Sequence, residues 1–204
     1  MKCASCKMKT KNMCDKEGFD CTGGKYTLDE CLEEENKPFH RLSGCFQAEY
    51  GNNLSRLDEV IMFAKRMGYK KIGMAFCIGL VDEAAVLEKI LSQHFEVYSA
   101  CCKIGGLKKE DYEIPKVKED KIEVVCDPIL QAKVLNKDKT ELNLAVGLCV
   151  GHDMLFNKYS NAPVTTYAVK DRILGHNPLA VCYSSYLRKK YMNKKYGIAD
   201  KLFK

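Results

Sequence analysis

From residue 55 onward, the chain alternates between short apolar runs and segments whose apolar residues recur at helical spacing. Continuous apolar runs bounded by turn residues predict buried strands. They occupy residues 72–76, 95–100, 122–125, 142–148 and 164–169. Alternating helices and apolar strands are typical of a parallel sheet covered on both faces. The sequence therefore predicts an α/β domain over residues 51–204 with a Rossmann-like, doubly wound sheet of about five strands.

Helix boundaries can be placed from capping residues. Ser55 and Asp58 form a capping-box pattern ahead of an amphipathic segment. Asp82 is placed to cap the next helix, and Asp127 followed by Pro128 is a strong helix start. A further helix is expected after Pro178, and it leads into a basic tail. We interpret that tail as a solvated helical face, because it lacks the aromatic platforms of a nucleic-acid-binding module.

Residues 1–50 differ from the rest, because they are polar, rich in cysteine and without clear apolar periodicity. Cys3 and Cys6 are separated by two residues, a spacing that lets both sulfurs of a tight turn face one metal ion. Cys14 and Cys21 can complete a four-thiolate shell, which suits zinc and iron–sulfur clusters alike. Residues 1–50 are therefore predicted to be a metal-binding segment. Cys31 and Cys45 fit either ligands or ordinary buried thiols.

The number of cysteines narrows the classes of protein to which the chain can belong. There are 12 cysteines in 204 residues, which indicates either a disulfide framework or metal ligation. The amino-terminal residues contain no apolar signal-peptide core, and no apolar run is long enough to cross a bilayer. We therefore expect a cytoplasmic protein that does not enter a membrane and whose thiols stay reduced, which favours metal or redox chemistry. The net charge of +6 is mild and does not indicate a nucleic-acid partner.

The predicted strands end in cysteine. Cys77, Cys101 or Cys102, Cys126 and Cys149 follow four successive strands. Crossovers in parallel sheets are right-handed, so the carboxyl ends of all strands lie along one rim, where ligands bind in such folds. A four-thiolate shell at this rim could hold an iron–sulfur cluster. Each cysteine taken alone could equally be a small buried apolar residue.

Two features refine this rim. Side chains alternate along a strand, and Cys102 lies nearer the turn at Gly105 and Gly106 than Cys101 does, which favours Cys102. Charged residues follow the last two strands: His152, Asp153, Lys158, Lys170, Asp171, Arg172 and His176. A His-Asp pair could transfer protons, and the cations could hold a small anionic ligand. The alternative is that Asp153 caps a helix and that residues 170–172 form a structural ion network.

Several stretches resemble a known family: Gly147-Leu-Cys-Val-Gly-His-Asp-Met-Leu-Phe, Lys158-Tyr-Ser-Asn-Ala-Pro-Val-Thr-Thr and Val169-Lys-Asp-Arg-Ile-Leu-Gly-His-Asn-Pro178. They are similar to the family catalogued as domain of unknown function 1847, whose members are described as predicted metal-binding proteins. The resemblance extends to Cys3-x-x-Cys6, Ala75-Phe-Cys-Ile-Gly-Leu, Cys102-Lys and Cys126-Asp-Pro-Ile-Leu-Gln-Ala. It implies metal binding, favours Cys102 over Cys101, and favours Cys3, Cys6, Cys14 and Cys21 as the amino-terminal set. Asn is common in the family where this chain has Asp127.

Three hypotheses follow. The first is an iron–sulfur redox protein or reductive enzyme, with Cys77, Cys102, Cys126 and Cys149 as cluster ligands. In this hypothesis His152, Asp153 and Lys170 are catalytic, the amino-terminal cysteines hold zinc or a second cluster, and an electron-donor protein is a partner. The second is a non-catalytic zinc-binding module. The third is thiol or persulfide chemistry without a metal at the rim.

Overall fold

The structure is a computed structural model of the chain, and it describes residues 3–6, 13–27 and 29–192. The chain divides into two compact units, Met1–Asn52 and Asn53–Lys204. Within the described residues, no helix combines the length and apolar character needed to cross a membrane.

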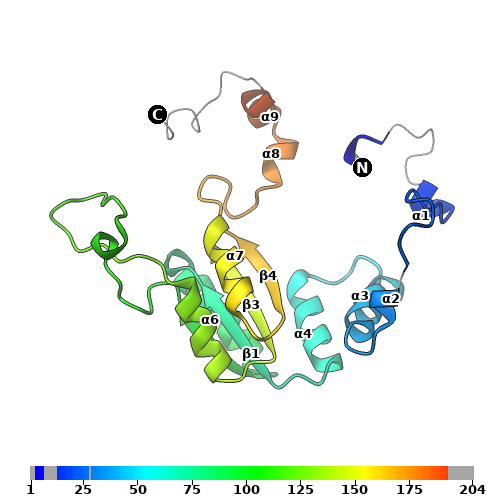
Figure 1. Cartoon of the computed structure of the whole chain (residues 1–204), viewed down its shortest axis with the longest axis horizontal. Helices are drawn as coiled ribbons and strands as arrows, with labels where there is room; N and C mark the ends of the chain where they lie inside the picture. The colour runs from blue at the N-terminus through cyan, green and yellow to red at the C-terminus, as the bar shows by residue number, and fades with distance from the viewer. Residues whose placement is uncertain (1–2, 7–12, 28, 193–204) are drawn as a thin grey trace. The chain divides into compact units, whose positions relative to one another are not determined.

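The second unit is built on a parallel sheet. Its strands are β1 (Lys71–Phe76), β2 (Glu96–Cys101), β3 (Leu142–Leu148) and β4 (Val164–Val169), in the order β2-β1-β3-β4 (Figure 1). All pairings are parallel, and Phe76 pairs with Cys101 on one side and Val146 on the other. The strand ends are therefore level, as the predicted rim requires. Every residue of β3 is buried, which explains its continuous apolar sequence.

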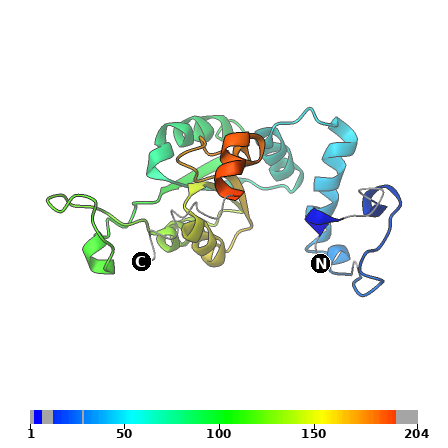
Figure 2. The ribbon, with the colours of Figure 1, turned by 90° about the horizontal axis from the view of Figure 1, so that it is seen from above.

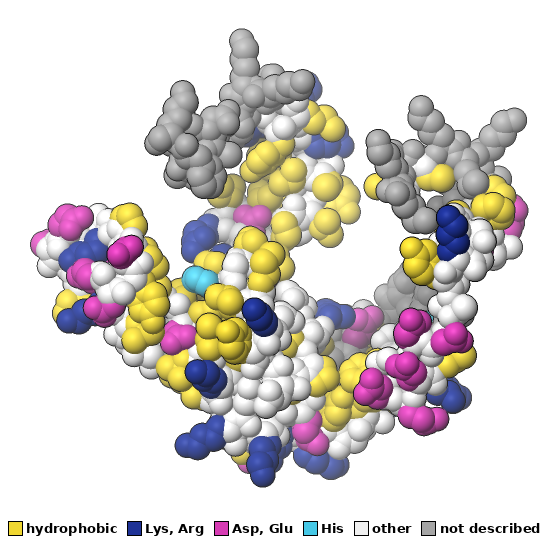
Figure 3. Space-filling model, viewed as in Figure 1, with side chains coloured by type: hydrophobic (Ala, Val, Ile, Leu, Met, Phe, Trp, Pro, Cys, Tyr) yellow, Lys and Arg dark blue, Asp and Glu magenta, His cyan; other side chains and the backbone are white. Residues whose placement is uncertain are grey.

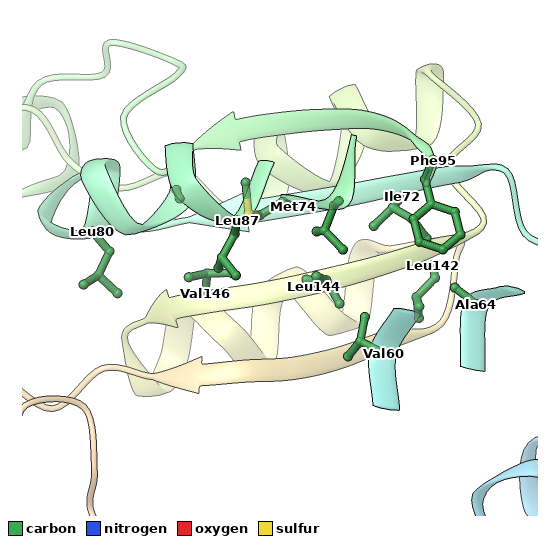
Figure 4. Close-up of a cluster of buried hydrophobic side chains, with 12 residues drawn as sticks. Val60, Ala64, Ile72, Met74, Leu80, Leu87, Phe95, Leu142, Leu144 and Val146 are labelled. Atoms are coloured by element: carbon green, nitrogen blue, oxygen red, sulfur yellow. The ribbon is translucent and has the colours of Figure 1, made fainter. Parts of the chain in front are cut away.

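Helices cover both faces of this sheet. On one face, α4 (Arg56–Arg66) and α5 (Val81–Leu91) pack apolar side chains against alternate residues of the strands (Figure 4). On the other, α6 (Pro128–Lys137) and α7 (Val150–Tyr159) bury Ala132, Leu135 and Phe156. Figure 2 shows α5 and α7 on opposite sides of the strands. The doubly wound α/β prediction is therefore confirmed.

The capping predictions are correct at two of three positions. Ser55 and Asp58 form the reciprocal capping box of α4, and the Asp127 side chain accepts from Leu130 N at 2.8 Å ahead of Pro128. Asp82 does not cap α5. A short 3-10 helix, η2 (Ile78–Leu80), runs directly into Val81, so Leu80 occupies the cap position and Asp82 lies in the first turn.

Residues 122–125 do not form the expected strand, and the sheet has four strands. Only Val124 makes a bridge, antiparallel to Lys108, within a loop that contains η3 (Lys109–Tyr112). Ile122 is 75% exposed, so this run has no buried face to place in the sheet. Lys109 and Glu123 fasten the loop to itself through a short ion pair with half-buried side chains. The run is apolar enough to resemble a strand, but its pairing partner is local.

The last described helices are α8 (Ala180–Tyr183) and α9 (Ser185–Met192). The single helix expected after Pro178 is interrupted at Ser184, whose backbone is extended.

The first unit contains η1 (Cys3–Ser5), α1 (Met13–Lys16), α2 (Asp29–Leu32) and α3 (Lys37–Tyr50). The sequence interpretation missed α3. Pro38 lies in the first turn, where proline is favourable, and Gly51 ends the helix at a positive φ of 60°. Phe46 is the one fully buried large apolar side chain among the described residues of this unit.

Candidate functional site

The order of the strands defines a switch point. From β1 the chain continues to β2 at one edge, and from β3 it continues to β4 at the other. The switch point therefore lies between the carboxyl ends of β1 and β3, where ligands bind in open α/β sheets. Cys77 and Cys149 are the first residues beyond these two strands, and Cys77 N donates to Val146 O at 3.0 Å.

Gly147 shapes the end of β3. Its φ is +66°, and a Cβ at this position would collide with Leu80, so only glycine fits. The register between β3 and β4 shifts on either side of Val146, and Gly147 lies within the second shift, which is the signature of a bulge. The bulge bends β3 just before Cys149 and is part of what sets the direction in which that residue leaves the sheet.

Three thiols gather at the ends of β1 and β2. Cys102 is 2% exposed, its N donates to Phe76 O at 2.9 Å, and its sulfur accepts from Ile78 N at 3.3 Å. Interaction with the Cys126 thiol and burial raise the pKa of Cys102, and the charge of Cys77 raises it further. Cys102, the member of the 101–102 pair that the sequence favours, therefore lies near Cys126 and near the turn that follows Cys77.

Cys126 reaches the rim without a strand to carry it. Asp127 N donates to Cys102 O at 2.8 Å, which ties the start of α6 to the end of β2. Interaction with the Cys102 thiol lowers the pKa of Cys126 to about 5, against the effect of burial, and nearby Lys103 and His152 lower it further. The same interaction raises the pKa of Cys102. In this pair the interaction favours the negative charge on Cys126 and the proton on Cys102.

Cys149 is held differently. It is the half-buried cap residue of α7, and Arg172 Nη2 donates to its sulfur at 3.5 Å. Within the described ranges, no group of three or more His, Cys, Asp or Glu side chains is positioned to hold a metal ion. The four thiols therefore line one rim without forming a closed ligand shell.

Lys170 brings a cation to the switch point. A Cβ built on Gly79 would lie 3.6 Å from Lys170 Nζ, and one built on Gly147 would lie 3.8 Å from it. The ammonium group thus lies between the turns that follow β1 and end β3. The Gly79 position is also 3.9 Å from Cys77 Sγ, so Lys170 and Cys77 border the same turn. Lys170 is half-buried, and among the interactions of the described residues none joins it to a carboxylate.

The other charged residues divide between the rim and structural positions. His152, half-buried in the first turn of α7, is close enough to Cys126 to lower its pKa. Asp171 closes the turn after β4, where its carboxylate accepts from Ile173 N and Leu174 N. His176 completes that turn, with Nδ1 3.1 Å from Asp171 N and 2.9 Å from Val169 O. Asp171 and His176 therefore close this turn through hydrogen bonds with the backbone, which differs from the ion network considered for residues 170–172.

Asp153 and Lys158 are not placed as expected. Cys149, not Asp153, is the cap of α7, and Asp153 lies in the first turn with its N donating to Cys149 O. Lys158 lies in the last turn of the helix and stacks over Tyr159, 5.9 Å from the ring centre. Since a helix rises 1.5 Å per residue, roughly 10 Å separates Lys158 from the rim end of α7. Lys158 is therefore not part of the candidate site.

Sequence reasoning missed two residues of the site. Lys103 donates a hydrogen bond to Val124 O, and its charge lowers the pKa of Cys126. Gln131 is fully buried, and its Nε2 donates to Phe76 O at 3.2 Å and to Ala100 O at 2.7 Å, while its Oε1 has no partner. Gln131 thus links α6 to the last residues of β1 and β2. Its position four residues after a helix-capping aspartate is the signal that was available.

The rim also carries exposed apolar side chains. They follow all four strands and comprise Ile78, Ile104, Val150, Met154 and Ile173. Figure 3 shows hydrophobic side chains gathered over the exposed face of α7. Their exposed fractions lie between 44% for Ile104 and 78% for Ile173. The thiols are therefore bordered by an apolar surface as well as by cations.

The amino-terminal cysteines form a second group, in the first unit. Cys6 N donates to Cys3 O at 3.1 Å in the expected tight turn. Burial raises the pKa of Cys21, and the charges of Cys14, Cys3 and Cys6 raise it further. All four predicted ligands are exposed. Cys31 and Cys45 are half-buried, in α2 and α3.

The fold and the thiols together define a doubly wound α/β protein with cysteines at the ends of its strands. The family described as "Protein of unknown function (DUF1847)" matches residues 20–167. The chain is also 47% identical over 197 residues to "Uncharacterized protein MJ0455" of Methanocaldococcus jannaschii, a match that covers 96% of this chain and 100% of the relative. The chain belongs to this family. No solved structure matches it.

Proposed function

We propose that this protein binds metal and acts in redox chemistry, with an iron–sulfur cluster held by Cys77, Cys102, Cys126 and Cys149. The observation that carries the proposal is the position of Cys77, Cys102 and Cys126 at the ends of β1 and β2, where Ile78 N donates to the Cys102 sulfur and Asp127 N donates to Cys102 O. Thiolates are the ligands of iron–sulfur clusters, and the lowered pKa of Cys126 favours its thiolate form.

The surroundings of the thiols fit an anionic group. Ile78 N–H donates to the Cys102 sulfur, and Arg172 donates to that of Cys149. Such donors stabilise bound thiolates and tune reduction potentials. When bound, the cluster would supply single-electron transfer. The protein would supply ligands, positive charge and a partly dry environment.

Three further residues have proposed roles in catalysis. His152, next to Cys126, would donate or accept a proton at the rim. Lys170, which has no carboxylate partner among the described residues, would bind a small anionic ligand between the turns at Gly79 and Gly147. Asp153, in the same turn as His152, would orient that imidazole as ligand binds.

The amino-terminal thiols and the rim surface complete the proposal. Cys3, Cys6, Cys14 and Cys21 would hold zinc or a second cluster, since Cys3 and Cys6 share a tight turn and the charges of Cys3, Cys6 and Cys14 act on Cys21. The exposed apolar side chains around the rim would receive an electron-donor protein. All 12 cysteines are free thiols, which fits a reducing compartment such as the cytoplasm.

The test is the visible spectrum of single cysteine variants purified without oxygen. Cys126→Ser and Cys149→Ser should each bleach the absorption of the α/β unit, because serine is a poor cluster ligand. Cys182→Ser, at an exposed cysteine of α8, is the matched control and should retain full colour. Unchanged spectra for both Cys126→Ser and Cys149→Ser would rule out this site.

A second candidate function is thiol or persulfide handling at the rim, with structural zinc at the amino-terminal cysteines. It is favoured by the low pKa of Cys126, which makes this sulfur a nucleophile without a metal. Protein that is colourless after anaerobic purification, holds zinc and reacts at Cys126 with a sulfane-sulfur donor would favour this function over the first.

A further inference from the structure

The Cys102–Cys126 contact has the layout of a dithiol in which one sulfur is reachable and the other is not. The hydrogen bond from Asp127 N to Cys102 O brings the two cysteines side by side. Cys102 is 2% exposed, whereas Cys126 is only half-buried. A small disulfide arriving from solvent therefore meets the Cys126 sulfur first. Cys102 stands directly behind it, with its sulfur fixed by the 3.3 Å hydrogen bond from Ile78 N.

The backbone keeps this pair together without a metal. Asp127 N donates to Cys102 O at 2.8 Å, so the residue after one cysteine is bonded to the other. Gly105 packs closely against the same helix start, since a Cβ there would lie 3.3 Å from Asp127 Oδ2. Gln131 then joins α6 to the ends of β1 and β2. The proximity of the two sulfurs is thus a property of the fold.

We propose that Cys102 and Cys126 form a reversible dithiol–disulfide couple in the metal-free chain, and that it exchanges with small-molecule disulfides. Cys126 is the attacking sulfur and Cys102 is the resolving sulfur. The activity goes beyond the proposed function, because it needs no metal and belongs to the metal-free form of the protein. It also preserves both sulfurs from further oxidation, since a disulfide does not proceed to sulfinic acid as an exposed thiolate does.

The exchange takes place in two balanced steps. The Cys126 sulfur attacks one sulfur of a disulfide such as glutathione disulfide, the bond between the glutathione sulfurs breaks, and one glutathione leaves as a thiolate that takes up a proton. Cys102 then attacks the Cys126 sulfur, forms the internal disulfide, and releases the second glutathione, which receives the proton that Cys102 lost. Two electrons pass from the protein dithiol to the small disulfide, which is the oxidant. Reduced glutathione in excess reverses both steps.

The neighbouring thiols are placed to react less. Cys77 is 9% exposed and is shielded at the switch point. The sulfur of Cys149 is held by Arg172. Lys103, which donates to Val124 O two residues before Cys126, brings a positive charge to the end of the chain segment where the attack occurs. The structure therefore selects one pair among the rim cysteines.

The experiment uses the full-length chain, stripped of metal with a chelator under reducing conditions and then desalted without oxygen. It is incubated with glutathione disulfide, alkylated, digested, and mapped by mass spectrometry. We expect a linked Cys102–Cys126 peptide as the main rim product and no lasting glutathione adduct. The Cys101→Ser background keeps the assignment unambiguous and should give the same product. A lasting adduct on Cys126, or a main link from Cys102 to Cys77, would overturn the proposal.

Two variants separate the roles. Cys102→Ser removes the resolving sulfur, so the mixed disulfide at Cys126 should accumulate to near completion. Cys126→Ser removes the attacking sulfur, so Cys102 should remain unmodified because it is buried. Modification of Cys102 at the wild-type rate in Cys126→Ser would contradict the assignment. The visible spectrum of the metal-loaded wild-type chain is recorded separately, so the absence of a cluster and the absence of exchange are distinct results.

Discussion

The two units of the chain use cysteine in opposite ways. In Asn53–Lys204, a core on each face of the sheet buries large apolar side chains such as Ile72, Leu144 and Phe156. In Met1–Asn52, the described residues fully bury one large apolar side chain, Phe46. The thiols follow the same division, since Cys77 and Cys102 are buried, whereas Cys3, Cys6, Cys14 and Cys21 are exposed.

This difference indicates what each group of thiols does for the fold. Burial of apolar surface is the main force that stabilises a domain, and small segments without a core rely on metals or disulfides. The α/β unit therefore folds on its own core and can present its thiols to a ligand. The amino-terminal unit would depend on its thiols for structure. Metal should matter for the fold of one unit and for the chemistry of the other.

Removal of metal should have the largest effect, and it should be confined to the first unit. Structural zinc sites contribute about 10 kcal/mol or more to folding. After chelation, the backbone amides of α3 should lose their protection from hydrogen exchange, while those of β3 keep theirs. The double variant Cys3→Ser, Cys6→Ser should have the same effect without chelator. Full protection of α3 in that variant would show that this unit folds without metal.

A cavity in the core of the α/β unit should destabilise that unit and leave the amino-terminal unit unchanged. Phe156 of α7 is fully buried, so Phe156→Ala should destabilise the α/β unit by about 3–5 kcal/mol. The measurement is urea unfolding followed by a probe in the sheet. Met154→Ala, on the same helix at a residue that is 65% exposed, is the control and should stay within about 0.5 kcal/mol of wild type. If α3 protection fell together with the sheet in Phe156→Ala, the two units would not be independent.

Gln131 connects the core to the rim, and its replacement should have an intermediate effect. Gln131→Met removes two donated hydrogen bonds but also the unpartnered Oε1, so we expect a loss of about 1–2 kcal/mol. Closure of the Cys102–Cys126 disulfide should slow as well, because the ends of β1 and β2 are no longer fixed to α6. The control is Lys133→Met at an exposed position of the same helix. If the disulfide closes at the wild-type rate in Gln131→Met, the role of Gln131 is confined to stabilising the core.

The smallest expected effect concerns the opposite end of the sheet. Glu141 accepts hydrogen bonds from Lys70 N at 2.6 Å and Lys71 N at 2.8 Å, and these lower its pKa. A group with a lowered folded pKa adds stability above its unfolded pKa, and this contribution is lost as the pH falls through the folded pKa. Glu141→Gln should therefore cost about 1 kcal/mol at neutral pH and progressively less below pH ~4.3.

Melting temperatures of Glu141→Gln and wild type across this pH range provide the measurement. Glu59→Gln, at a surface residue that pairs with Arg56, should shift the melting temperature very little. A constant difference between Glu141→Gln and wild type at all pH values would mean that the carboxylate charge is not what the two amides stabilise.

The order of helices and strands was predictable, because the strands pack against helices on the faces of the sheet. Buried packing of this kind requires apolar residues at regular positions along the chain. The expected strand at 122–125 was wrong, because an apolar run does not reveal what it pairs with. Even so, Cys126 lies at the rim, since its neighbour Asp127 is bonded to Cys102 O. The sequence therefore predicted that this thiol lies at the rim, although the strand expected before it does not form.

The side-chain contacts within the candidate site were harder to predict from the sequence. Lys103 and Gln131 act through contacts with Val124, Phe76 and Ala100, which are distant in sequence, and no local spacing encodes those contacts. The roles of Asp171 and Lys170 differ because one side chain folds back onto its own turn and the other reaches the switch point. The sequence placed both residues after the last strand but did not indicate which one would face the rim.

The most direct test of the account is the metal content of the full-length protein purified without oxygen. Iron, zinc and acid-labile sulfide are counted per chain, and the visible spectrum is recorded on the same sample. The account predicts a broad brown absorption with about four irons and as much sulfide for the rim cluster. This absorption should be lost in Cys126→Ser. Colourless protein that holds zinc alone, with no sulfide, would contradict the account and leave the rim cysteines as reactive thiols.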